Sequence, residues 1–311
     1  MLLCKICQRT LQIGKVITAD TGWMETDKIQ RRFDMGRKIG IIIPSYNQGK
    51  YIEAAICSVL ANKKHADIAV GVMDGGSMDE TRSVILRYER QIDIWCSEAD
   101  NGQADAINKG IRALPDCKYY MWLNSDDVFE DEYAVSRIAE YAEQNQLEVC
   151  YGLSHFVDEQ GRIIGEYPVE EFSRDKLGNR CFISQPSVLF SRKAYEATGP
   201  IDETLKMCLD YEYWIRLAQR YDFGFIKEYI GSTRMYGETK TSMMQQQHLK
   251  EAMNILMKYY GKVPMQWIVT KVLADYPGSV LRYIPKRILG VLLRPVRKKV
   301  IAGSLDGNSD D

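Results

Sequence analysis

The chain has 311 residues, of which 45% are hydrophobic and 27% charged, and its formal net charge is -1. This composition is typical of a globular protein and excludes a disordered or fibrous chain. It also excludes nucleic-acid binding driven by overall charge, which needs a strongly basic protein, so we expect no nucleic-acid partner.

The first segment, residues 1–36, is polar and weakly periodic, and we interpret it as an N-terminal extension. Its start lacks the apolar core and cleavage site of a signal peptide. Cys4 and Cys7 have the spacing of half a zinc site, but no second pair follows, so we do not expect zinc. Most of the eight cysteines lie in apolar runs, which indicates a reducing, cytoplasmic compartment.

Strands and helices then alternate along the chain. Short runs rich in β-branched and other apolar residues predict buried strands at 39–43, 68–73, 92–97 and 119–123. Apolar spacing predicts helices between them, at 50–61, 79–90 and 103–113. This alternation indicates a doubly wound α/β sheet.

The second half has a mixed pattern that we expect to cover the cleft of the sheet and to supply the site of a second substrate. Helices are predicted near 131–145, 191–198, 208–221 and 241–260, and strands near 148–157, 162–166, 187–190 and 224–230. No segment has the about eighteen uncharged apolar residues that a membrane-spanning helix requires.

Polar clusters follow three of the predicted strands, at 45–47, 74–77 and 124–127. Ligands of such sheets bind outside the carboxyl ends of the strands, so the clusters predict one cleft. Asp126 and Asp127 offer the oxygen ligands that magnesium or manganese prefers beside a diphosphate. Alternatively, Ser125 or Asp126 caps the next helix, and residues 74–79 form a glycine turn with a helix cap.

Four segments together resemble, in order and spacing, the family 2 glycosyltransferases of the GT-A fold: residues 43–47, 73–79, 100–110 and 122–127. The resemblance runs from about residue 38 to 250. It implies an α/β fold with a doubly wound mixed, mainly parallel sheet and a C-terminal helical appendage. We therefore expect a glycosyltransferase domain at 37–260 and a basic amphipathic tail at 261–311.

The resemblance also implies how the donor is bound. Pro44, Ser45 and Tyr46 match the segment that lies against the nucleotide base, and Asp74 matches the aspartate that reads the base edge by accepting an N–H.

A helix near the nucleotide or donor sugar is matched by Asp105, Asn108 and Lys109. Alternatively, Asp105 and Lys109 form an i,i+4 ion pair on an exposed face.

The metal-binding motif is matched by Asp126, on the nucleotide side, and Asp127, which implies a manganese or magnesium cofactor. Asn124 stands where many relatives have the first aspartate of this motif. Arg234 lies where relatives place an arginine over the diphosphate, and Tyr236 replaces the histidine that often follows.

The general base is matched by Asp210, with Glu212 as the second candidate, because Leu209 occupies the first acidic position of the motif. The alternative is an amphipathic helix with an aspartate near its N-terminus, stabilised by the helix dipole. Gln185 matches an element near the acceptor, or else is an ordinary junction between loop and strand.

The function implied by the resemblance is inverting transfer of a sugar from a nucleoside-diphosphate sugar to a saccharide or lipid-linked saccharide acceptor, in cell-surface polysaccharide or glycolipid assembly. The alternative is an inactive carbohydrate- or nucleotide-binding subunit of the same fold, favoured by the departures at Asn124, Leu209 and Tyr236. A nucleotidyltransferase would need a glycine- and lysine-rich phosphate loop, which residues 45–50 do not provide.

The tail has seven basic and no acidic residues between 282 and 299, interleaved with leucine, isoleucine and valine. This pattern predicts that residues 279–300 bind an anionic membrane surface, which would place the protein peripherally on the inner face of the cell membrane. The alternative is a helix that packs one face on the domain.

Overall fold

The computed structural model describes residues 38–237 and 244–275, all within one unit of the chain. The predicted N-terminal extension with Cys4 and Cys7 and the predicted membrane-binding segment at 279–300 lie outside the described residues.

The first half of the sheet is parallel and runs in the order β3-β2-β1-β4. Its strands are β1 (Ile39–Ser45), β2 (Ile68–Asp74), β3 (Ile94–Ser97) and β4 (Tyr119–Trp122), and the helices between them are α2 (Ile52–Asn62), α3 (Thr81–Arg87) and α4 (Gln103–Ala113). Ser45, the last residue of β1, pairs with Asp74, the last residue of β2, which pairs in turn with Ser97 of β3. The carboxyl ends of β1, β2 and β3 therefore lie level with one another.

The second half of the sheet continues from β4 in the order β8-β6-β9-β5. These strands are β5 (Val128–Phe129), β6 (Val149–Val157), β8 (Val188–Ser191) and β9 (Gly224–Arg234), with β7 (Ile163–Glu166) paired to β6. β8 is antiparallel to both β4 and β6, β9 is parallel to β6, and β5 is antiparallel to β9. The described part of the chain thus forms one mixed sheet of nine strands.

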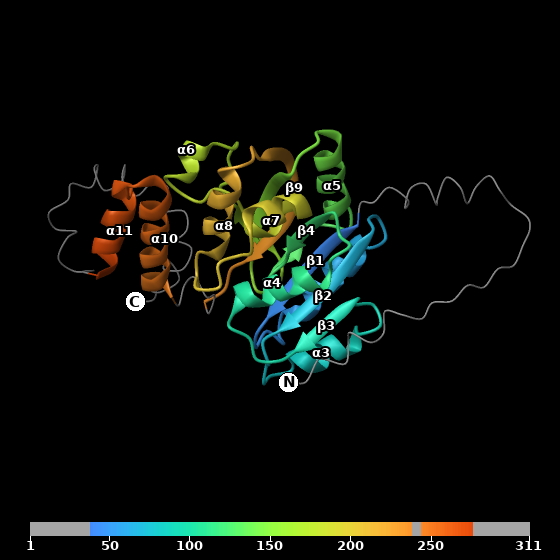
Figure 1. The fold of residues 1–311 in the computed structure, drawn as a ribbon. Helices are drawn as coiled ribbons and strands as arrows, with labels where there is room; N and C mark the ends of the chain where they lie inside the picture. Colours follow the sequence, from blue (N-terminus) through green and yellow to red (C-terminus); the bar gives the residue numbers. More distant parts are fainter. Residues whose placement is uncertain (1–37, 238–243, 276–311) are drawn as a thin grey trace, which may run out of the picture. The chain divides into compact units, whose positions relative to one another are not determined.

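The remaining helices surround this half and extend beyond it (Figure 1). They are α5 (Ala134–Gln144), α6 (Arg174–Leu177), a 3-10 turn η2 (Gln185–Ser187), α7 (Arg192–Thr198), α8 (Leu209–Ala218), α10 (Gln245–Tyr260) and α11 (Met265–Asp275). α10 contacts both α8 and α11, which confirms a helical C-terminal part. Among the described residues, no helix is both long and apolar enough to cross a membrane.

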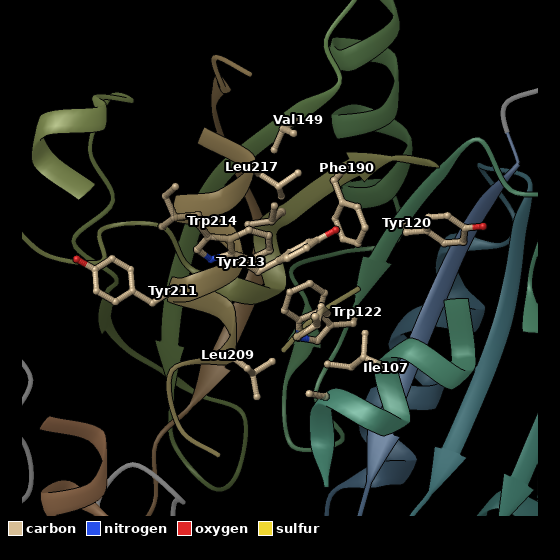
Figure 2. Close-up of a cluster of buried hydrophobic side chains, with 14 of the residues drawn as sticks. Ile107, Tyr120, Trp122, Val149, Phe190, Leu209, Tyr211, Tyr213, Trp214 and Leu217 are labelled. Carbon is tan, nitrogen blue, oxygen red and sulfur yellow. The ribbon is translucent and has the colours of Figure 1, made fainter. Parts of the chain in front are cut away.

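Two hydrophobic clusters lie on opposite faces of the sheet, because alternate residues of a strand point to opposite sides. In β1, Ile41 and Ile43 belong to one cluster and Ile42 to the other. The cluster that contains Ile42 also contains Trp122 of β4 and Trp214 of α8, whose rings stack with centroids 5.1 Å apart (Figure 2). This contact fixes α8 against the centre of the sheet.

α4 packs directly against β1. At Gly110 of α4, a Cβ atom would lie only 2.5 Å from Cγ2 of Ile42, so no side chain fits between helix and strand there.

Candidate active site

The loops that follow β1 and β2 are joined by hydrogen bonds. The N–H of Asn47 donates to Oγ of Ser77 at 2.7 Å, and Oδ1 of Asn47 accepts from the N–H of Met78 at 2.9 Å. The N–H of Gly49 donates to the carboxylate of Asp79 at 2.9 Å. Asn47 has a φ of 51°, a left-handed conformation that asparagine tolerates better than most residues. The two loops therefore form one framework beside the strand ends.

Asp74 lies at the centre of this framework and is 1% exposed. Its carboxylate accepts hydrogen bonds from the N–H of Ser77 at 3.0 Å, from Oγ of Ser97 at 2.6 Å and from Oγ of Ser77. Beside it, the buried hydroxyl of Ser45 has no hydrogen-bond partner within the described residues. An unpaired buried hydroxyl calls for an explanation, and a bound ligand would supply one.

Two other residues expected at the base flank Ser45 in the sequence. Pro44 is buried in β1, and Tyr46 is 62% exposed at the start of the loop. The structure thus brings Pro44, Ser45, Tyr46 and Asp74 to one place.

Asp105 and Lys109 form an ion pair on α4, with 3.2 Å between Nζ of Lys109 and Oδ2 of Asp105. Asp105 is only 5% exposed and also accepts the N–H of Asn101 at 3.0 Å. Burial raises the pKa of Asp105, but the Asn101 N–H and the Lys109 ammonium outweigh it and hold the pKa below its ordinary value. The i,i+4 pair is therefore present, but Asp105 is buried rather than exposed.

The side chain of Asn108 is hydrogen-bonded to the segment between α7 and α8. Its Nδ2 donates to the carbonyl of Ile201 at 2.8 Å and to Glu203 at 3.0 Å, and its Oδ1 accepts the N–H of Ile201 at 3.0 Å. The fully buried amide links α4 to the segment before α8, so these hydrogen bonds go to that segment and not to another predicted site residue.

The carboxylate pair follows β4. Asp127 is buried and accepts the N–H of Arg234 at 3.0 Å and Nδ2 of Asn124 at 3.1 Å. Burial, and then the neighbouring charge of Asp126, raise the pKa of Asp127 well above its ordinary value. Asp126 is half-buried and accepts the hydroxyl of Tyr236 at 2.9 Å. A bound cation would relieve the repulsion between these two carboxylates.

The hydroxyl of Tyr236 serves as a hydrogen-bond donor to Asp126. Burial, followed by the charge of Asp126, raises its pKa, so the phenol stays neutral. Its ring packs against Tyr51 with centroids 4.8 Å apart.

The side chains at this site supply only part of the ligands that a divalent cation needs. Among the described residues, no three His, Cys, Asp or Glu side chains gather into a metal-binding group. Asp126 and Asp127 could thus hold a divalent cation whose remaining oxygen ligands come from a diphosphate and water, as is usual for magnesium.

Arg234 supports the loops around the carboxylates. It is buried, its Nε donates to the carbonyl of Asp126 at 2.8 Å, and its Nη1 donates to the carbonyls of Asp158 and Glu159 at 2.8 and 2.9 Å. The structure therefore brings Arg234 next to the carboxylate pair, with much of its donor capacity used by the main chain.

The two acids of α8 have different surroundings. Asp210 is half-buried in the first turn of the helix, where its Oδ1 accepts the N–H of Tyr211 at 2.8 Å. Glu212 is 2% exposed and accepts from Nε of Arg216 at 2.9 Å and from the hydroxyl of Tyr259. The buried carboxylate of Glu212 is thus held by two other side chains.

Gln185 lies at the carboxyl end of β4. Its Nε2 donates to the carbonyl of Trp122 at 2.6 Å, and its buried Oε1 has no partner within the described residues. The structure therefore brings Gln185 next to the carboxylate motif.

Sequence reasoning missed two residues of this region. Ser97 holds Asp74, and Nε2 of Gln103 donates to Asn124 at 2.6 Å. The position of Ser97 at the end of a predicted strand was a usable signal, whereas the partner of Gln103 is distant in sequence.

Comparisons with known proteins give a family and a fold. Residues 40–199 match the model of the family described as glycosyl transferase family 2. An uncharacterized glycosyltransferase of Rickettsia prowazekii is 26% identical over 73% of this chain and 74% of its own length. Chondroitin synthase of Escherichia coli is 26% identical over 68% of this chain, but the match spans only 32% of that longer protein.

Two solved structures resemble the fold. TarS of S. aureus in complex with UDP-GlcNAc has a TM-score of 0.57 and 13% identity, over 86% of this chain and 83% of that chain. The mannosyltransferase PcManGT of Pyrobaculum calidifontis, with GDP-Man and Mn2+, has a TM-score of 0.54 and 14% identity, over 84% and 79%. These likenesses confirm the GT-A fold that the sequence predicts.

Proposed function

The chain belongs to glycosyltransferase family 2, and from this membership we propose that it is an inverting glycosyltransferase that uses a nucleoside-diphosphate sugar. The observation that carries the proposal is the shared location of Asp74 and the Asp126–Asp127 pair at the carboxyl ends of parallel strands. α8, which bears Asp210, is held against the last residue of β4 by the stacked Trp122 and Trp214.

The donor nucleotide would bind along the loops after β1 and β2. A carboxylate held by Ser77 and Ser97 can accept an N–H from a base edge, and the unpaired hydroxyl of Ser45 lies beside it. Asp105 and Lys109 would lie near the donor on α4. Two structural neighbours are solved with UDP-GlcNAc and with GDP-Man, which supports a nucleotide sugar but leaves the base open.

A manganese or magnesium ion would be held by Asp126 and Asp127. When bound, it would offset the negative charge of the departing diphosphate. Arg234 adds a fixed positive charge beside the same carboxylates.

The chemical step would use Asp210 as the general base. As the acceptor oxygen attacks the anomeric carbon, its proton passes to the Asp210 carboxylate and the bond to the nucleoside diphosphate breaks, which inverts the anomeric centre. Such a base usually contributes about a hundred- to ten-thousand-fold to the rate. Gln185, at the end of β4, would lie on the acceptor side.

We infer the acceptor and the cellular location from the sequence alone. We place the protein in the cytoplasm, peripherally on the inner face of the cell membrane through residues 279–300, where a lipid-linked saccharide would be accessible. This fits a role in cell-surface polysaccharide or glycolipid assembly. The division into 1–36, 37–260 and 261–311 belongs to the same proposal.

The rival function is a catalytically inactive subunit that binds nucleotide or carbohydrate. Asn124, Leu209 and Tyr236 favour it, because each replaces a residue with ligand or acid character in the family motif.

The test is the release of nucleoside diphosphate by the purified full chain from a panel of nucleotide sugars, with and without manganese. We expect release with one donor, dependent on manganese and lost in Asp127→Ala. The control is Asp116→Ala, an exposed aspartate just before β4, at the opposite end of that strand. Binding of a nucleotide sugar without any release would support the inactive subunit instead.

A further inference from the structure

The segment that leads into α8 is held by a side chain of α10. The carboxylate of Glu251 accepts hydrogen bonds from three consecutive N–H groups, those of Lys206 at 3.1 Å, Met207 at 2.8 Å and Cys208 at 3.1 Å. Cys208 is the N-cap residue of α8, and its own side chain makes no capping hydrogen bond. A residue from another helix therefore holds the N-cap residue of α8 and the two residues before it.

The Glu251 carboxylate is itself held in a charged, oriented state. Nε2 of Gln247 donates to it at 2.9 Å. Burial raises the pKa of Glu251, but the hydrogen bonds from Met207, Gln247, Cys208 and Lys206 outweigh it and hold the pKa below its ordinary value. A negative charge near the N-terminus of a helix is also favoured by the helix dipole.

α8 is thus fixed from two sides. On the side of the sheet, Trp214 stacks on Trp122 (Figure 2). On the side of α10, Glu251 holds the residues before the helix, and the hydroxyl of Tyr259 donates to Glu212. Asp210 lies two residues after Cys208, within the turn whose start Glu251 holds.

We propose that Glu251 is a positioning residue for Asp210, and that α10 is in this way part of the active site without touching substrate. The inference rests on the proposed function, in which Asp210 is the base. A general base acts only within hydrogen-bond reach of the proton it takes. A misplacement of about 1 Å caused by a remote substitution can cost about a hundredfold in rate.

The test compares Glu251→Gln, which keeps the shape of the side chain and removes its charge, with the full wild-type chain. We expect kcat for nucleoside-diphosphate release to fall about ten- to a hundredfold, while KM for the donor changes less than about twofold. Glu251→Asp keeps the carboxylate and should restore part of the lost kcat. The matched control is Asp275→Asn on α11, which loses a carboxylate paired with Lys271 at 2.9 Å and should keep the wild-type kcat.

Hydrogen exchange gives a second readout that needs no substrate. Peptides covering residues 206–212 should exchange faster in Glu251→Gln and at the wild-type rate in Asp275→Asn. Unchanged exchange, or a lower Tm with an unchanged kcat per folded molecule, would overturn the positioning role. If the wild type releases no diphosphate from any donor, it is the proposed function that fails, and faster exchange would still support the hold of Glu251 on this segment.

Discussion

The hydroxyl of Tyr236 donates a hydrogen bond to the Asp126 carboxylate at 2.9 Å, so the residue that replaces a family histidine acts on the carboxylate itself. A cation bound at Oδ2 of Asp126 would compete with this donor. A hydrogen bond to a charged group contributes about 1.5–3 kcal/mol.

We therefore expect Tyr236→Phe to tighten manganese binding by about tenfold, since part of that competing bond is removed. Calorimetric titration of the full chain with manganese, in the presence of a nucleoside diphosphate, measures the change. The control is Tyr133→Phe, an exposed tyrosine just before α5. Weaker manganese binding in Tyr236→Phe would show that the phenol supports the cation rather than competes with it.

The raised pKa of Asp127 predicts how stability depends on pH when no metal is added. Because the folded-state pKa lies above the unfolded value, the contribution of Asp127 to stability is present at low pH and is lost as pH rises through the folded pKa. Asp127→Asn removes the charge that causes this loss. Its Tm should exceed that of the wild type at pH 7.5, by about 2–4 °C for each kcal/mol gained in the free energy of unfolding. The difference in Tm should be smaller at pH 4. An equal or lower Tm at pH 7.5 would contradict the prediction.

Asp210→Asn should lower turnover at least about a hundredfold while it preserves donor affinity, because the amide keeps the shape of the side chain and cannot take a proton. Glu212→Gln is the comparison. It should destabilise the fold by about 1–3 kcal/mol, because the buried carboxylate accepts from Arg216 and Tyr259, and leave kcat per folded molecule near the wild type. The assignment of the base moves to Glu212 if that variant is the inactive one.

Asn108→Ala separates a structural role from a ligand contact. The buried amide makes hydrogen bonds to Ile201 and Glu203, so its loss should lower the free energy of unfolding by about 1–3 kcal/mol. Donor affinity of the folded fraction should not change. A selective loss of donor affinity, with normal denaturant unfolding, would restore the nucleotide-binding role that the sequence motif implies.

Membrane binding by residues 279–300, which lie outside the described residues, is tested by truncation after Gly278. Each lysine or arginine near an anionic surface contributes about 1 kcal/mol, and the apolar residues add to this. Co-sedimentation with anionic vesicles should be lost on truncation and weakened by high salt in the intact chain. Equal sedimentation of both proteins would mean that the tail packs on the domain.

The strands and helices of the first half could be predicted from the sequence because local patterns determine them. Residues 39–43 form a buried β-branched run, and the helix predicted at 103–113 has those bounds in the structure. β5 has only two residues and exists because it pairs with Gly231 and Ser232 of β9, a long-range contact that no local pattern reveals.

In the candidate site, too, only the residues placed by local patterns could be predicted from the sequence. Asp74, Asp126 and Asp127 follow strands, and their positions could be deduced from strand ends. The partner of Asn108 is Ile201, and the partner of Cys208 is Glu251; each lies far along the chain, so their roles depended on the tertiary structure.

The missing side chain at Gly110 sets the height of α4 above the sheet. A methyl group there would lie 2.5 Å from Cγ2 of Ile42, so Gly110→Ala would push α4 away from the sheet. Gln103, at the start of the same helix, would move with it, and its 2.6 Å hydrogen bond to Asn124 would lengthen or break. A substitution that contacts neither nucleotide nor sugar would thereby loosen the loop that carries Asp126 and Asp127.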